Sequence, residues 1–166
     1  MKRTASIAFA LVAIVFVSFG SVRATDPQHA DIEGTYKLVG RTMIDSTVKT
    51  APEVIGMMTF TKTYRNLNVA WKDANGKSFS YSVISKYVLT DTSYTETKLF
   101  SSMNDELSGA GLKQDYASST QTVPVTFDNG KVSFKFPFDP VSVVFDGDKI
   151  TATANMGFID SWFKIR

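Results

Sequence analysis

The chain has 166 residues, of which 43% are hydrophobic, with 18 basic and 16 acidic side chains, a single histidine and no cysteine. Without cysteine there are no disulfides, so the fold must rest on packing and hydrogen bonds. The charges are nearly balanced and form no basic cluster, which excludes a nucleic-acid partner.

Residues 1–24 have the three parts of a secretory signal: a basic start, an apolar run over 7–19, and small residues leading to a cut near Ala24. The apolar run is shorter than the roughly 20 residues that a membrane helix needs. An uncleaved anchor is the alternative. Three basic residues leave with this segment, and 15 basic against 16 acidic residues then give a net charge of −1. We expect a periplasmic or secreted protein with no stable membrane span after cleavage, a flexible lead-in over 25–31 and one domain over 32–166.

From Gly34 onward the hydrophobic pattern has a period of two, with β-branched and aromatic residues, which is typical of half-buried strands. The pattern predicts an all-β fold, a single antiparallel up-and-down barrel of about eight to ten strands, with a sandwich as the alternative. Residues 103–119 interrupt the pattern and predict a short helical turn and a long loop, either a lid or a plain connection. The expected strands are 34–43, 56–64, 65–73, 77–90, 93–102, 120–128, 131–138, 141–146, 149–156 and 158–165.

Three turns predict which residues face one another. Asn129-Gly130 and Gly147-Asp148 are typical of two-residue hairpin turns, and Gly76 of a three-residue loop whose last residue has positive φ. A turn near Thr90–Ser93 would place Glu96, Lys98 and Phe100 on the same face of the sheet as Trp71. The expected pairs are Phe127 with Val132, Val125 with Phe134, Val123 with Phe136, Phe145 with Ile150, Val143 with Ala152, Trp71 with Phe79, Val69 with Tyr81, Leu67 with Val83, Leu89 with Tyr94, and Tyr87 with Glu96.

The segment Ile32-Glu33-Gly34-Thr35-Tyr36-Lys37-Leu38 resembles the opening strand of the lipocalin and fatty-acid-binding superfamily. Further likeness to bacterial lipocalin-like domain proteins lies in 56–61, 64–69, 79–82, 94–97 and 102–105. The resemblance implies an antiparallel barrel that holds an apolar or amphipathic ligand. One departure is Tyr36, which stands where lipocalins usually carry tryptophan. We expect the last strand, with Trp162, Lys164 and Arg166, to supply the basic partner of this ring.

The inventory of reactive groups argues against several kinds of chemistry. His29 lies in the lead-in, away from any fixed nucleophile, so a Ser-His-Asp triad is not expected and no catalytic residue is assigned. Asp139, Asp146 and Asp148 lack the spacing of a calcium loop, and Asp146-Gly147-Asp148 is typical of a hairpin turn. We therefore expect no metal and no cofactor.

Two charged residues have competing interpretations. Glu96 would orient a polar ligand group or accept a proton if it faced inward, but the cost of burying a carboxylate favours a solvent-facing position. Arg65 would hold a ligand carboxylate at the barrel mouth, or else end a strand and face water, which the exposure of most arginines favours.

The leading hypothesis is an exported protein that binds a small apolar or amphipathic molecule inside the barrel, by burial of apolar surface with one or two orienting polar groups. The alternatives are a barrel isomerase or cyclase acting on a lipid-like substrate, and a structural or interaction module with a solid core. An enzyme is the less favoured of these. The candidate ligand-binding residues are Arg65, Leu67, Val69, Trp71, Phe79, Tyr81, Val83, Tyr94, Glu96, Phe134 and Phe136.

Overall fold

The computed structural model describes residues 31–155 and 157–166, and within these ranges every regular element is a β-strand. The predicted signal and most of the lead-in lie outside the described residues. The strands are β1 (Gly34–Met43), β2 (Val48–Lys49), β3 (Val54–Phe60), β4 (Tyr64–Lys72), β5 (Ser78–Leu89), β6 (Ser93–Asp105), β7 (Gly111–Asp115), β8 (Ser119–Pro124), β9 (Thr126–Asp128), β10 (Lys131–Lys135), β11 (Val141–Asp146), β12 (Lys149–Ala154) and β13 (Phe158–Ile165).

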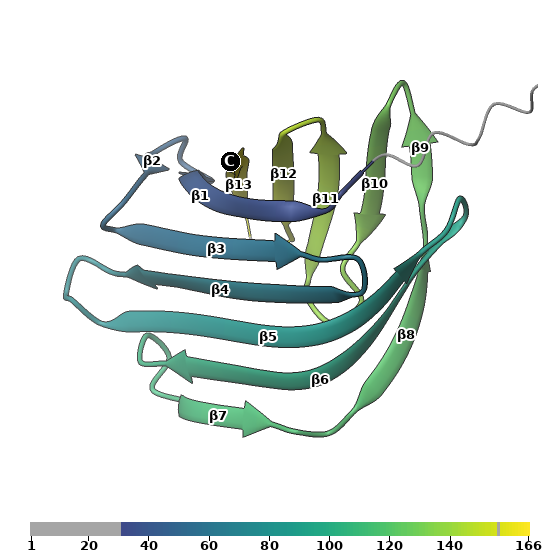
Figure 1. Ribbon diagram of the computed structural model, residues 1–166. Coiled ribbons are helices and arrows are strands. Elements are labelled where there is room, and N and C mark those ends of the chain that lie inside the picture. The colour runs from purple at the N-terminus through teal and green to yellow at the C-terminus, as the bar shows by residue number, and fades with distance from the viewer. Residues whose placement is uncertain (1–30, 156) are drawn as a thin grey trace, which may run out of the picture.

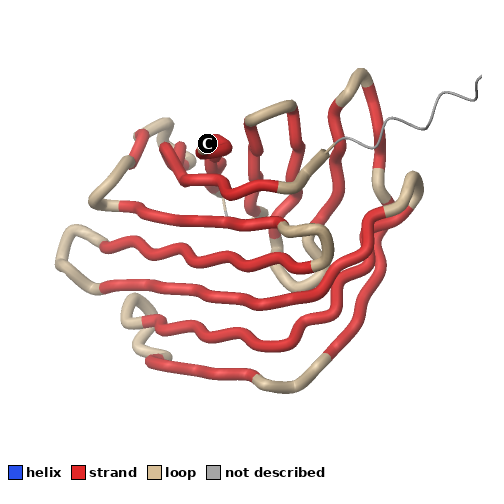
Figure 2. The backbone as a smooth tube through the Cα atoms, in the orientation of Figure 1, coloured by secondary structure: helices blue, strands red, loops and turns tan. Residues whose placement is uncertain are grey.

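The strands form one antiparallel sheet that curls into a half-barrel (Figure 1). The order across the sheet is β7-β6-β5-β4-β3-β1-β13-β12-β11-β10-β9, with β2 beside β1 and β8 beside β6. The tube trace shows the two halves of the sheet turned toward one another, with short loops at their ends (Figure 2). The prediction of an all-β barrel-like fold is confirmed.

The segment 119–128 links the two ends of the sheet. Its first part, β8, pairs with the beginning of β6, and its second part, β9, pairs with β10. At the other end of β6, β7 pairs with residues 101–105, and within the described chain β7 has no strand on its second side. The half-barrel is therefore bridged on one side and open beside β7.

The concave face carries the core because alternate residues of each strand point inward. Tyr36, Phe60 and Phe145 have 0%, 1% and 3% of their surface exposed, and their rings meet edge to face with centroids 5.4–6.4 Å apart. Tyr94 stacks on Phe134 at 4.3 Å. Aromatic side chains thus fill the bridged side of the half-barrel.

Turn chemistry predicted the hairpins well. Trp71 pairs with Phe79 across a loop in which Gly76 has a φ of +80°, and Phe145 pairs with Ile150. The pairs Leu89–Tyr94 and Tyr87–Glu96 are also confirmed.

The predicted hairpin around Asn129-Gly130 is only partly right. Phe127 pairs with Val132 as expected, but Val123 pairs with Tyr94 instead of Phe136, and the amide of Val125 donates to the carbonyl of Thr92. The chain changes partner at Pro124, which has no N–H to extend a ladder on β10.

The predicted helical turn and long loop over 103–119 are wrong. Strand β6 runs on to Asp105, a tight turn follows, and β7 returns beside it. Gly109 and Gly111 have positive φ, a conformation that glycine adopts without strain, so these glycines suit the turn between β6 and β7. No helix in the described part of the chain is long and apolar enough to cross a membrane.

A register shift between Ile84 and Ser85 overturns one further prediction. It places Phe100 opposite the exposed Ile84, on the convex face, and not beside Trp71. A bulge adds one residue and so reverses the facing of every side chain beyond it.

Candidate functional site

The predicted ligand-binding residues lie on the concave face, where they separate into two groups. Four are half-buried, and the others are buried in the packed interior. The half-buried group is Val69, Trp71, Phe79 and Tyr81; the buried group is Arg65, Leu67, Val83, Tyr94, Glu96, Phe134 and Phe136. No ligand reaches the second group unless the core opens.

Arg65 is the centre of a buried charge cluster. Its side chain is 0% exposed; one guanidinium nitrogen lies 3.2 Å from Glu96 and the other binds Asp139. Its guanidinium carbon lies 3.9 Å from the centroid of the Phe136 ring. Burial would lower the pKa of Arg65, but Asp139 and Glu96 outweigh it and raise the pKa, so the guanidinium stays charged.

The preferred solvent-facing interpretations of Arg65 and Glu96 are therefore wrong. Both side chains are 0% exposed, because each charge finds a partner inside the sheet. Within the described residues, Arg65 Nε and Glu96 Oε1 have no hydrogen-bond partner, and neither has the Oγ of Ser85, which lies opposite Arg65. The cluster therefore contains buried hydrogen-bonding atoms that no described protein atom pairs with.

Tyr81 joins this cluster to the open side. Its hydroxyl donates to Asp139 at 2.8 Å. Burial, and then the charge of Asp139, raise the pKa of Tyr81 far above its usual value. Tyr94, deeper inside, also has a raised pKa, mainly from burial and further from the charge of Glu96, which outweigh the opposing effect of Arg65.

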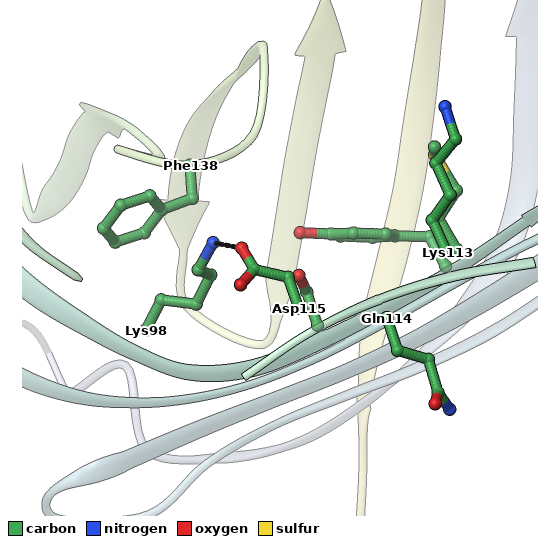
Figure 3. A pocket seen from close by; sticks show the side chains of 8 residues that line it. Lys98, Lys113, Gln114, Asp115 and Phe138 are labelled. Carbon is green, nitrogen blue, oxygen red and sulfur yellow. Dashed lines mark hydrogen bonds and ion pairs between the residues drawn. The ribbon is translucent and has the colours of Figure 1, made fainter. Parts of the chain in front are cut away.

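A pocket of about 310 Å³ opens beside β7, where the sheet is not bridged. Lys98 of β6 and Asp115 of β7 form an ion pair across it, and the ammonium of Lys98 lies 5.5 Å from the centroid of Phe138 (Figure 3). Gln114 points away, to the other face of its strand (Figure 3). The lining residues are Tyr81, Lys98, Ser101, Met103, Lys113, Gln114, Asp115 and Phe138.

The pocket joins an apolar wall to a positive rim. Tyr81, Met103 and Phe138 supply the wall, while Lys98, Lys113 and Asp115 lie at the rim. Lys113 pairs with Met103 in the ladder, so it shares the concave face. Such a combination suits a molecule with an apolar body and a negative group.

Sequence reasoning found only Tyr81 among the lining residues of its candidate list. Lys113 and Asp115 were missed because their segment was assigned to a loop. The alternation of Leu112, Lys113, Gln114 and Asp115 could have indicated a strand with two charges on one face.

A second buried cation lies beside the half-buried aromatics. Arg41 is 4% exposed and binds Asp160 through two hydrogen bonds of 2.7 and 2.8 Å. It lies 4.3 Å from the ring of Trp71 and 3.8 Å from that of Phe158. Trp71 in turn stacks on Phe79 at 4.1 Å, so two predicted ligand-binding residues already have partners within the protein.

The expected basic partner of Tyr36 is Lys164 and not Arg166. The Lys164 ammonium lies 5.6 Å from the centroid of the Tyr36 ring. Arg166, with its side chain 87% exposed, binds Asp148 at the surface instead.

A second depression, of about 360 Å³, lies on the convex side, where the exposed Ile55 and Met57 contribute to it. Residues 31–155 and 157–166 contain no group of three or more His, Cys, Asp or Glu side chains placed to hold a metal ion.

Comparison with known proteins adds no relative. No protein-family model matches the chain, no curated protein matches it, and no solved structure matches its fold.

Proposed function

We propose that this protein binds a small amphipathic anion in the pocket beside β7. The observation that supports the proposal best is the meeting of Lys98 and Lys113 with the apolar wall of Tyr81, Met103 and Phe138. At about 310 Å³ the pocket lies at the lower end of the range typical for small-molecule sites.

The packed core directs the ligand to the open side. Tyr94 and Phe134 are 0% and 5% exposed and stack on each other, so the bridged side offers no room. The ligand's apolar part would contact Met103 and Phe138, and its negative group would compete with Asp115 for Lys98. That exchange costs little, because the Asp115 side chain is 46% exposed and regains water when it is released.

The proposal includes the lipocalin-like character and the export suggested by the sequence. The opening Gly34-Thr35-Tyr36 segment and the curled antiparallel sheet support the first. The basic and apolar start of the chain supports the second. The isomerase alternative gains no comparable support, since Glu96 is buried behind Arg65 and does not line the pocket.

The test compares two fluorescent probes with one aromatic skeleton: anionic 8-anilinonaphthalene-1-sulfonate and uncharged N-phenyl-1-naphthylamine. We expect saturable enhancement with the sulfonate and weaker uptake of the neutral probe. Lys98→Met should weaken sulfonate binding about fivefold or more, since it removes a charged partner. Lys135→Met is the matched control, because Lys135 is exposed between the buried Phe134 and Phe136 and faces outward.

Equal binding of the two probes would contradict an anion site, as would equal affinity in Lys98→Met and Lys135→Met. Thermal melting of both variants establishes that each is folded before its affinity is compared.

A further inference from the structure

The proton of the Tyr81 hydroxyl is used in a hydrogen bond within the protein. The hydroxyl donates to one oxygen of Asp139, and the other oxygen of that carboxylate accepts from Arg65. Asp139 is 8% exposed and Arg65 is 0% exposed, so water does not compete freely for either bond. The three groups form one chain of hydrogen bonds that ends at the pocket wall.

A phenol has one proton to donate and lone pairs that accept. Because the proton of Tyr81 points to Asp139, its oxygen offers only lone pairs to the pocket. Donation to a carboxylate polarises the O–H bond and makes the oxygen a better acceptor. Burial and Asp139 raise the pKa of this hydroxyl, so it remains a protonated phenol at ordinary pH.

Lys98 and Lys113 can only donate hydrogen bonds, since an ammonium group has no acceptor. The pocket thus presents donors with positive charge at its rim and a polarised acceptor at Tyr81. A ligand that satisfies both must be an acceptor at one position and a donor at another.

We infer that the pocket selects amphipathic anions that also carry a hydroxyl or N–H group, with Tyr81 as the residue that recognises this donor. The inference rests on the proposed binding function and names the ligand class. An acid without the donor displaces water from the Tyr81 oxygen without giving its lone pairs a new hydrogen bond, which weakens the binding of that acid.

The test uses ten-carbon carboxylates in competition with the anilinonaphthalene sulfonate. Decanoate is compared with hydroxydecanoates that carry the hydroxyl at carbon 3, 5 or 8, and with the methyl ether of each. The ether keeps the oxygen but removes the donor. For at least one position we expect the hydroxy acid to bind about three- to tenfold more tightly than its ether. In Tyr81→Phe this preference should disappear.

The outcomes separate the two proposals. If the acids bind in a Lys98-dependent way but no hydroxy acid exceeds its ether, the donor selection is wrong and the anion site stands. If the preference persists in Tyr81→Phe, another group recognises the donor and the assignment to Tyr81 is wrong. If no acid displaces a probe that binds in a Lys98-dependent way, the donor selection is wrong; if the probe itself shows no saturable binding, the binding function fails. The comparison of hydroxy acid with ether uses the unmodified protein, so it tests the preference for a donor even if Tyr81→Phe folds poorly.

Discussion

Replacing Arg65 by methionine tests the buried charge cluster directly. The change removes the cation that faces Glu96 and Asp139, all three being at most 8% exposed. Breaking a buried ion pair by removing one partner costs about 3–5 kcal/mol, because the remaining charge has no compensation. Two carboxylates lose their partner here, so the decrease in the free energy of unfolding should lie toward the upper end of that range. For a domain of this size it lowers the melting temperature by about 10–20 °C.

Urea denaturation followed by circular dichroism measures this loss. Adding Glu96→Gln and Asp139→Asn to Arg65→Met should restore part of the stability at pH 7.

Arg166→Met is the matched control. This side chain is 87% exposed and binds Asp148 at the surface, so its removal should change stability by no more than about 0.5 kcal/mol. A loss below about 1 kcal/mol in Arg65→Met would refute the account of the cluster.

Three further predictions concern packing and the tyrosines. In Gly56→Ala the new Cβ would lie 2.7 Å from a Trp162 ring carbon, so the variant should lose about 1–3 kcal/mol in urea denaturation; an unchanged midpoint would contradict this contact. Lys164→Ala should lower the free energy of unfolding by about 0.5–1 kcal/mol through its lost contact with the Tyr36 ring, and Arg166→Ala should lower it less. The reverse order would indicate that Arg166, and not Lys164, is the partner of Tyr36. Burial, chiefly, raises the pKa of Tyr36 from 10.0 to about 12, so the stability from its protonated form is complete below pH 10 and is lost as the pH rises toward 12. The phenolate absorbance of the buried tyrosine should therefore appear together with alkaline unfolding. If all the phenolates appeared before unfolding, the burial of Tyr36 would be contradicted.

The hairpins were predictable because their signals are local. A turn residue such as Gly76 or Gly147 specifies the register of the strands on both sides, and with it the facing of Trp71 and Phe145. The change of partner at Pro124 is not local. It depends on β6, some 30 residues earlier in the chain, and no turn signal reports it.

The buried charges were missed for a related reason. Arg65 lies 31 residues from Glu96 and 74 residues from Asp139, so a local pattern shows an isolated arginine. An isolated charge is costly to bury, and the expectation of exposure follows from that cost. Only the curl of the sheet brings the partners together. The pocket beside β7 depends on the same tertiary arrangement.

The most direct test of the binding proposal is nuclear magnetic resonance of methionine methyl groups during titration with decanoate. Three methionines report on three places: Met103 lines the pocket, Met58 is 1% exposed in the core, and Met57 lies at the depression on the convex side. We predict a saturable shift of the Met103 signal that Lys98→Met weakens, with Met57 and Met58 unchanged. A saturable shift at Met57 or Met58 without one at Met103, or no saturable shift at all, would contradict the account.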